Sequence, residues 1–242
     1  MRDGWESEAS NWAKFTRTPG HDSTHEEVNL PALLSLLPPP DGVTLDLGCG
    51  EGRLARVLRS LGYQVAALDA APTLVRLAAS HENPVPAVLA DAAALPFRDQ
   101  AFGLVVAYMS LHDMDAMPQA VAEVGRVLAR GGRLCAAIPH PINSAGSFPS
   151  QDANDEDAPF TIEGSYLDQA PADWVADWGG ITMTFHSEHR PLEAYSQALE
   201  AAGLLIEAIR EPRPSEERVT RRPSQRRWQR IPMALHMRAV KG

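Results

Sequence analysis

The sequence predicts an α/β fold built on a mostly parallel sheet, and three observations carry this prediction. Short apolar segments alternate with amphipathic, helix-like segments across residues 43–139. Two of the short segments, 104–108 (LVVAY) and 134–138 (LCAAI), are apolar throughout, which is typical of strands covered on both faces. The chain has 242 residues, 44% of them hydrophobic, which is enough for one large domain with its own core.

The first elements follow from proline, glycine and the spacing of leucines. Residues 1–22 are mixed in composition and receive no element prediction. Residues 23–37 are predicted to be helical, and Pro31 either divides them or starts a second short helix, since proline fits the first turn of a helix and not its interior. Residues 38–42 (PPPDG) stop this helix. Its candidate N-caps are Asp22, Ser23 and Thr24.

Strands and helices then alternate up to Pro139. Helical spacing of apolar residues begins after a glycine-rich turn, again at Pro72 and again at Met117, and the last of these helices is expected to end at Gly131–Gly132. Parallel pairing with right-handed crossovers follows from this order. The predicted strands are residues 43–47, 64–68, 86–90, 102–108 and 133–138.

The second half breaks the alternation. Residues 140–190 are polar, and a segment of this length inside a compact domain is typical of a lid or a substrate-binding insertion. A helix is predicted at 191–202, with further strands at 204–209 and 231–240. Residues 210–230, rich in Arg, Pro and Glu, are predicted to be a mobile, solvated loop; the alternative is that 213–230 attract an anionic acceptor.

Composition excludes several classes of function. The net charge of −9 argues against broad affinity for nucleic acid phosphates. The sequence contains no run of 18 apolar residues, so no membrane-spanning helix is predicted. The polar N-terminus lacks the apolar region of a secretory signal. Two cysteines, Cys49 and Cys135, make no disulfide framework, so we expect a reduced, cytoplasmic protein. Histidines and cysteines lack metal-ligand spacing, so no metal is expected.

The most informative segment is Asp46–Gly52 (DLGCGEG), between a predicted strand and a predicted helix. Its glycines permit a tight turn and a close approach of a ligand to the backbone, and amides at the start of a helix can donate hydrogen bonds. A dinucleotide-binding G-x-G-x-x-G would need a third glycine where Arg53 stands, so the spacing disfavours NAD and FAD. Asp46 suits a cationic group, such as the ammonium of an amino acid, better than a pyrophosphate. The alternative is a helix-start turn without a ligand.

Two further acids follow the next two strands. Asp69 can accept hydrogen bonds from vicinal ribose hydroxyls, or it can cap the helix that begins at Pro72. Asp91, together with the amide of Ala92, can recognise the amine and ring nitrogen of an adenine, or it can be a turn aspartate. Because parallel strands end at one edge of a sheet, and open α/β sheets bind ligands at that edge, these acids and Asp46 are expected to share one site.

These segments, together with Leu95–Phe97 and the Gly131–Arg133 turn, resemble the class I S-adenosylmethionine-dependent methyltransferases, and most of all the small-molecule group called methyltransferase type 11. The resemblance covers residues 40–140. Weaker likeness extends to Trp12 and 17–22, and to the helix entry at 189–192. The implied fold is a Rossmann-like, doubly wound seven-stranded sheet in the order 3-2-1-4-5-7-6 with an antiparallel last strand. Gly103 replaces the Asp usual in relatives, which we expect to affect the entry of its strand and not the site.

The resemblance also implies a cofactor, S-adenosyl-L-methionine, and roles for individual residues. Asp46 and the backbone of Gly48, Cys49 and Gly50 would hold its methionine moiety, Asp69 with Ala70 its ribose, and Asp91 with Ala92 its adenine; Tyr108 and Met109 would flank the sulfonium, and Arg17 or His21 would meet the carboxylate. The chain is then one methyltransferase domain, 1–242. Its parts are a cofactor-covering segment at 1–40, a cofactor-binding core at 41–139, a lid insertion at 140–190 and a C-terminal part at 191–242.

Candidate catalytic and substrate residues follow the later strands. His112 and His140 stand after the fourth and fifth strands and are candidate general bases, or each caps a loop or packs locally. Asp113 and Asp115 are expected to cap the next helix. In the insertion, three aromatic residues are candidates for an acceptor pocket or for a small separate core: Tyr166, Trp174 and Trp178.

The leading hypothesis is an enzyme that methylates a small molecule on O, N or C by in-line displacement. In such a reaction the protein mainly aligns the reacting atoms, and a base is needed only if the acceptor must lose a proton. A non-catalytic module that binds S-adenosylmethionine is the alternative, and an NAD-dependent oxidoreductase is disfavoured by the glycine spacing. The expected partner is a small-molecule acceptor, with no nucleic acid and no membrane. The sequence leaves monomer and homodimer open.

Overall fold

The computed structural model describes residues 1–150 and 152–242 and is organised around one seven-stranded sheet. The strand order is β12-β13-β5-β4-β1-β2-β3, with parallel pairing from β3 to β5 and an antiparallel β13 between β5 and β12. This confirms the predicted fold class and strand order. The strands are β1 (Val43–Leu47), β2 (Gln64–Asp69), β3 (Ala87–Leu89), β4 (Phe102–Tyr108), β5 (Leu128–Pro139), β12 (Leu204–Arg210) and β13 (Ala234–Lys241).

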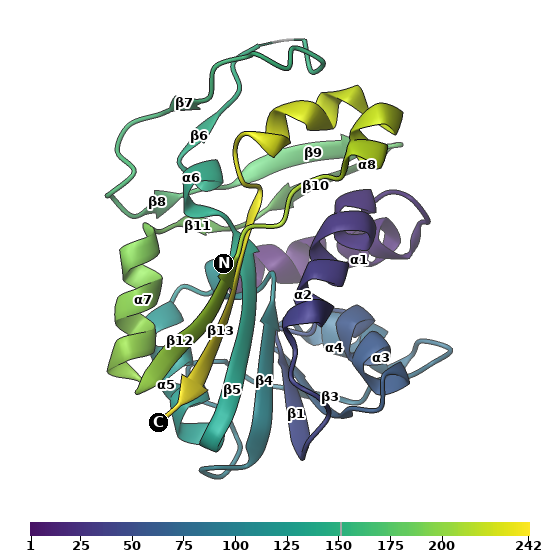
Figure 1. Cartoon of the computed structure of the whole chain (residues 1–242). Coiled ribbons are helices and arrows are strands. Elements are labelled where there is room, and N and C mark those ends of the chain that lie inside the picture. The colour runs from purple at the N-terminus through teal and green to yellow at the C-terminus, as the bar shows by residue number, and fades with distance from the viewer. Residues whose placement is uncertain (151) are drawn as a thin grey trace.

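Helices cover both faces of this sheet (Figure 1). One face packs against α2 (Leu30–Leu36) and α3 (Arg53–Ser60), and the other against α5 (Met117–Val127) and α7 (Leu192–Ala201). Adjacent residues of β4 serve the two cores, Val105 on the α5 side and Val106 on the α3 side, and both are fully buried. This is why the central strands are apolar throughout.

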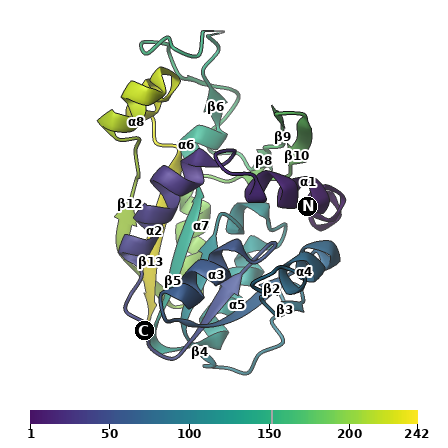
Figure 2. The same cartoon turned by 90° about the vertical axis from the view of Figure 1, so that its right-hand side faces the viewer.

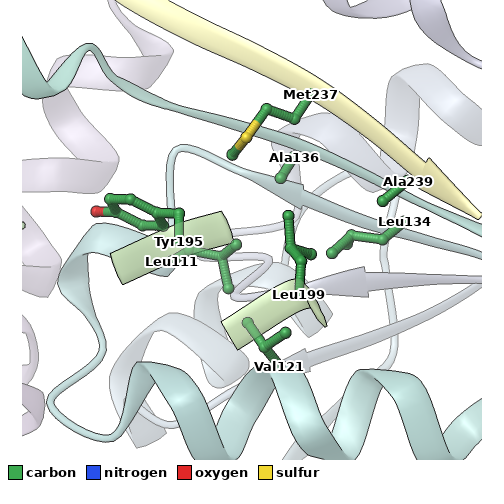
Figure 3. A pocket seen from close by; sticks show the side chains of 8 residues that line it. All are labelled: Leu111, Val121, Leu134, Ala136, Tyr195, Leu199, Met237 and Ala239. Carbon is green, nitrogen blue, oxygen red and sulfur yellow. The ribbon is translucent and has the colours of Figure 1, made fainter. Parts of the chain in front are cut away.

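The core between the sheet and the helices α5 and α7 is closely packed. Figure 3 shows eight side chains that converge there, among them Val121, Leu199 and Met237, around a gap of only about 10 Å³. Such a gap is apolar and at the lower limit for one water molecule, so it is part of the core and not a ligand site. No helix among the described residues is both long enough and apolar enough to span a membrane.

The N-terminal segment is more ordered than its sequence suggests. Residues Arg2–Arg17 form helix α1, which packs against α4 (Pro72–Ala79) and β10 (Ile181–Phe185). A π-helical turn, His25–Asn29, then leads directly into α2, so the predicted break near Pro31 falls at the start of α2. Asp22, one of the predicted caps, accepts a hydrogen bond from the backbone N of His25.

Residues 140–150 and 152–190 form one short helix and three antiparallel strand pairs above the sheet. The most regular part is an antiparallel hairpin of β9 (Trp174–Trp178) and β10 (Ile181–Phe185), which Figure 2 shows beside α1. The other elements of this region are α6 (Pro141–Ser144), β6 (Gly146–Ser147), β7 (Thr161–Ile162), β8 (Ala170–Pro171) and β11 (Glu188–His189).

The prediction of a mobile loop at 210–230 is wrong. This segment contains helix α8 (Glu216–Arg221) and a 3₁₀ helix, η3 (Pro223–Gln229), and Arg218 is only 2% exposed. The guanidinium of Arg218 donates to the backbone O and the Oγ of Ser23 and pairs with Glu27 at 3.0 Å. These partners lie almost 200 positions earlier in the chain, and a charge-rich composition does not reveal them.

Two features lie at the edge of the sheet where the parallel strands β4 and β5 begin. One differs from the prediction and the other agrees with it. Helix α5 ends at Val127 and β5 begins at Leu128, earlier than the glycines that were expected to separate them. At Gly103 an added Cβ would lie 2.6 Å from the carbonyl O of Asp41. Glycine is therefore needed where the chain enters β4, away from the strand ends that carry the predicted site.

Candidate functional site

A cavity of about 720 Å³ lies at the carboxyl ends of the parallel strands. Its lining includes Asp46 from β1, Asp69 from β2, Asp91 after β3 and Tyr108 from β4. The three carboxylates that the sequence placed at successive strand ends therefore face one space. A volume of this size accommodates a small ligand with room to spare.

Most of the predicted site residues line this cavity, and three do not. Those that line it are Asp46, Gly48, Cys49, Gly50, Asp69, Ala70, Asp91, Ala92, Tyr108, Met109, His21, His112, Trp174 and Trp178. Arg17, His140 and Tyr166 are absent from the lining.

The glycine turn uses its own amides internally. Gly48 and Gly50 have φ angles of +73° and +56°, a region that favours glycine. The N–H groups of Gly48 and Cys49 both donate to the carbonyl of Leu68 at 2.9 Å, and the N–H of Gly50 donates to Oδ2 of Asp69 at 2.8 Å. The expectation that amides of this turn donate to a ligand is corrected here. A turn whose amides are already engaged is poorly suited to a pyrophosphate.

Asp46 instead offers a free acceptor. Its side chain is 1% exposed, and its Oδ2 has no hydrogen-bond partner among the described residues. Burial, together with the nearby charge of Asp69, raises the pKa of Asp46 to about 7, although a backbone hydrogen bond from Ala55 opposes this. A buried carboxylate oxygen of this kind is expensive until a cation reaches it. The ammonium group of an amino acid moiety fits that requirement.

This pKa predicts how the affinity for an ammonium-bearing ligand changes with pH. The free protein binds a proton at Asp46 that the ammonium complex must release, so affinity rises as the pH rises through about 7 and levels off above it. Below that point we expect about a tenfold loss per pH unit. The free energy of unfolding of the free protein falls as the pH rises from the ordinary pKa of an aspartate to about 7, because burial penalises the ionised carboxylate of Asp46.

Calorimetric titration of S-adenosylhomocysteine between about pH 5.5 and 8.5 measures this dependence. The Asp46→Asn variant keeps the shape of the side chain, and its binding should be weaker and flatter across the range. An affinity of the unmodified protein that does not change with pH would contradict the assignment of Asp46 to the ammonium.

Asp69 braces the turn from the neighbouring strand. Its Oδ1 accepts from the N–H of Ala71 at 2.9 Å, in addition to the bond from Gly50 to Oδ2. Burial raises the pKa of Asp69. Helix α4 has Ala71 at its N-cap without a side-chain bond, so Asp69 is not the cap of that helix. Each carboxylate oxygen has a second lone pair, which leaves capacity for ribose hydroxyls.

Asp91 acts as a turn aspartate and also lines the cavity, so both of its predicted roles are compatible with the structure. Its Oδ1 accepts from the N–H of Ala93 at 2.8 Å, which is the behaviour of a turn aspartate. It also lines the cavity beside Ala92, which is 7% exposed. The turn therefore holds this carboxylate at the rim of the cavity.

An aromatic wall closes the cavity above the glycine turn. Trp174 stacks on Phe185 at a centroid distance of 4.2 Å, and Trp178 lies 4.4 Å from Phe15 of α1. An added Cβ at Gly50 would come within 3.3 Å of Nε1 of Trp12, so this wall reaches the turn itself. The tryptophans of the insertion thus pack with α1 as a small core and line the cavity too. The six members of the wall are Trp5, Trp12, Phe15, Trp174, Trp178 and Phe185.

His112 and Asp113 form a buried pair in the cavity wall, within the 3₁₀ turn Leu111–Asp113 after β4. Nε2 of His112 lies 3.1 Å from Oδ1 of Asp113, but that oxygen has no hydrogen bond of good geometry. Burial, and then the charge of Arg190, lowers the pKa of His112 to about 3, and burial raises the pKa of Asp113 well above its usual range. Asp113 is not a helix cap as predicted, because α5 has Ala116 at its N-cap.

The three predicted residues outside the lining have other partners. Nδ1 of His140 accepts from the N–H of Ile142 and caps α6, while its Nε2 contacts Glu211 at 3.1 Å. Arg17 pairs with Glu51 at 3.0 Å, so its guanidinium supports the glycine turn and does not reach the cavity. The structure thus favours the alternative, local role for His140, and of Arg17 and His21 only His21 lines the cavity.

Tyr166 also lies elsewhere. Its hydroxyl accepts from the N–H of Leu192 at 3.1 Å, and its ring packs against His189. It secures the entry of α7 and corrects the expectation of a substrate contact.

Several lining residues carried no signal in the sequence. His25 bridges Arg53 and Tyr108, and Arg218 and Arg222 come from the segment that was expected to be a loop. Only Arg53 had a usable signal, since it directly follows the glycine turn at the start of α3. The others are brought to the cavity by elements far apart in the chain.

Comparison with known proteins agrees with this geometry. A family model described as a methyltransferase domain matches residues 45–136. Malonyl-acyl-carrier protein O-methyltransferase of Pseudescherichia vulneris is 30% identical over 150 residues, 58% of each chain. The 2-phytyl-1,4-naphtoquinone methyltransferase of Thermosynechococcus vestitus is 42% identical over 117 residues, 44% of this chain and 51% of its own. The matched part thus spans little more than half the length of these curated relatives.

A solved structure extends the likeness over most of the chain. The S-adenosylmethionine-dependent methyltransferase from Mesorhizobium loti superposes with a TM-score of 0.71 at 26% identity, and the match covers 87% of this chain and 96% of that one. The strand order, the cavity at the strand ends and the acid series of Asp46, Asp69 and Asp91 occur together with these matches. Residues 45–136 therefore match the methyltransferase domain family, and the chain as a whole has the fold of the class I S-adenosylmethionine-dependent methyltransferases.

Proposed function

We propose that this protein transfers the methyl group of S-adenosylmethionine to a small-molecule acceptor that binds in the same cavity. One observation carries the proposal: the amides of Gly48, Cys49 and Gly50 are used within the protein, while Oδ2 of Asp46 is left unpaired in the cavity. This arrangement suits the ammonium of a methionine moiety and disfavours a pyrophosphate. Asp69 and Asp91 are then available for the ribose and the adenine.

The residues of the cavity suggest how transfer is assisted. When bound, S-adenosylmethionine supplies an electrophilic methyl carbon, and in-line attack by the acceptor leaves the sulfur as a neutral thioether. The protein aligns the acceptor, which is worth about 7–11 kcal/mol when the geometry is good. The aromatic wall over the glycine turn excludes water from the reacting atoms.

The pair of His112 and Asp113 in the cavity wall bears on whether the reaction uses a general base. The pKa of His112, lowered to about 3 mainly by burial, leaves this histidine neutral and only weakly basic at neutral pH. Burial raises the pKa of Asp113. His112 is therefore proposed to accept a hydrogen bond from the acceptor and not to remove a proton from a weak acid. This favours an acceptor that is already nucleophilic when it binds.

Replacement of Asp69 tests the cofactor site. Asp69→Asn should weaken S-adenosylhomocysteine binding about 10- to 100-fold, because hydrogen bonds to a charged group contribute about 1.5–3 kcal/mol. The control is Asp99→Asn, since Asp99 is an exposed partner of Arg126 and lies outside the cavity lining. Equal affinities of the two variants, measured by calorimetry, would be inconsistent with the proposed role of Asp69.

Transfer itself is tested with methyl-labelled S-adenosylmethionine and a cell extract separated by size. Label in the small-molecule fraction is the expected result, with less label for Asp69→Asn at low cofactor concentration. Label found only in macromolecules would contradict the small-molecule acceptor. Binding of the cofactor without label in any fraction would indicate a non-catalytic module instead.

A further inference from the structure

The cavity is divided by charge between its two ends. Three lining carboxylates stand at the ends of β1, β2 and β3, where the cofactor is proposed to bind; they are Asp46, Asp69 and Asp91. Two further lining acids, Asp113 and Asp115, follow β4. The other end is lined by the segment before α2, the π-helical turn, the start of α3, and α8 with η3; the polar residues there include Asp22, His25, Asn29, Arg53, Arg218, Arg222 and Gln225. Figure 2 shows α8 on the side of α2, and α1 with β9 and β10 on the side of α4.

At the second end of the cavity, hydrogen bonds that link Arg53, His25 and Tyr108 determine which ring nitrogen of His25 carries the proton. Nε of Arg53 lies 2.9 Å from Nε2 of His25, and Nδ1 of His25 lies 2.8 Å from the hydroxyl oxygen of Tyr108. An arginine Nε–H can only donate, so Nε2 of His25 is an acceptor and its ring proton is on Nδ1. Nδ1–H of His25 then donates to Tyr108. The pKa of His25, lowered to about 3 mainly by burial, agrees with a neutral ring.

Tyr108 is consequently left with an unused donor. Its oxygen accepts from His25, and its own hydrogen has no acceptor among the described protein groups. Burial raises the pKa of Tyr108, so the hydroxyl keeps that hydrogen. A second unused donor lies on Arg53, whose Nη1 is buried and unpaired while its Nη2 pairs with Asp22 at 2.9 Å. Both side chains line the cavity.

We propose that Tyr108 and Arg53 form an oxyanion subsite that binds a carboxylate of the methyl acceptor, and that His25 positions Tyr108 as the donor. This inference rests on the proposed function, because it identifies the acceptor as a carboxylate-bearing small molecule. Charge supports it. Asp22 balances Arg53, and Glu27 balances Arg218, whereas Arg222 has only the Oγ of Ser23 as a partner among the described residues. Of the arginines that line this end of the cavity, Arg222 is therefore the one without a carboxylate partner among the described residues.

The tautomer of His25 gives a direct structural test. The nitrogen-15 spectrum of the histidine side chains, assigned with a His25→Asn variant, should show His25 as the neutral Nδ1–H form from about pH 5 to 8. The groups that face His25 are Arg53, Tyr108 and Asp22. A protonated ring, or a proton on Nε2, would overturn the chain of bonds on which the subsite depends.

Binding is tested with a matched pair of probes, benzoate and the neutral benzamide, on the complex with S-adenosylhomocysteine. Benzoate should bind better than benzamide, and Tyr108→Phe should weaken benzoate about tenfold or more without changing benzamide. Tyr63→Phe is the control, since that hydroxyl donates to the carbonyl of Pro38 outside the cavity. For the positioning role, His25→Asn should retain much of the benzoate affinity, because its amide can still donate to Tyr108, whereas His25→Leu should lose it.

The outcomes separate this inference from the proposed function. Benzoate that binds Tyr108→Phe as well as the unmodified protein, or fails to bind at tens of millimolar, overturns the subsite. Benzoate that competes with S-adenosylhomocysteine also overturns it, because the carboxylate in question would then be that of the cofactor. Should S-adenosylhomocysteine itself not bind, the proposed function fails, and the same probes on the cofactor-free protein still decide the subsite.

Discussion

Replacement of Arg218 by methionine is expected to lower the free energy of unfolding by about 3–5 kcal/mol. Arg218 is 2% exposed, and its guanidinium joins α8 to the segment before α2 through Ser23 and Glu27. Methionine fills a similar space but leaves the carbonyl of Ser23 and the carboxylate of Glu27 without that partner. Glu27 is 29% exposed and keeps Arg221, so the loss comes mainly from the buried oxygens of Ser23, which are left without the guanidinium that they accept from.

Arg221 provides a matched control for this prediction. It lies on the same helix and contacts the same carboxylate of Glu27 at 2.9 Å, but its side chain is 55% exposed. Arg221→Met should therefore cost less than about 1 kcal/mol. Urea denaturation of both variants measures the difference, and equal losses would mean that burial of Arg218 does not determine the stability of this region.

The Gly48→Ala variant is expected to lose about 2–5 kcal/mol of folding free energy and to bind S-adenosylhomocysteine more weakly. An alanine at a φ of +73° is strained by about 1–2 kcal/mol, and its Cβ would lie 2.6 Å from Cβ of Ser110, which adds about 1–3 kcal/mol of overpacking. Ser110 cannot move freely, because its Oγ donates to the carbonyl of Leu47 at 2.7 Å. Relief of the clash would displace the end of β4 beside the cavity.

Gly42→Ala separates strain from packing in this experiment. Gly42 has a φ of +70°, but an added Cβ would meet nothing within 4 Å. The variant should lose only about 1–2 kcal/mol and leave ligand binding unchanged. If thermal or urea denaturation showed the two glycine variants to be equally destabilised, the contact between Gly48 and Ser110 would not matter.

The carboxylates of the cofactor site were predictable because they depend on local patterns. Asp46, Asp69 and Asp91 each follow an apolar segment, and parallel strands must end at one edge of the sheet. The hydrogen bonds of the turn were less predictable. The amides of Gly48 and Cys49 appeared free in the sequence, but the carbonyl of Leu68 on the neighbouring strand accepts both.

The local sequence was misleading wherever distant segments decide the environment. Asp113 precedes a helix and has the composition of a cap, yet it is buried in the cavity wall. His140 follows a strand just as His112 does, but its ring turns to α6 and Glu211. Residues 210–230 look solvated, although Arg218 is almost fully buried. For Arg218 the partners that settle its role, Ser23 and Glu27, come from elements remote in the chain.

The amino-acid sequence by itself determined the class of fold, the order of the central strands and the three acids at their ends, because these depend on periodicity and on the geometry of parallel pairing. Only the tertiary structure decided which amides of the turn are occupied, which arginines are buried and which way the proton of His25 points. Those properties depend on contacts between segments such as 22–29, 53 and 218–225, which lie far apart in the sequence and meet only when the sheet is covered.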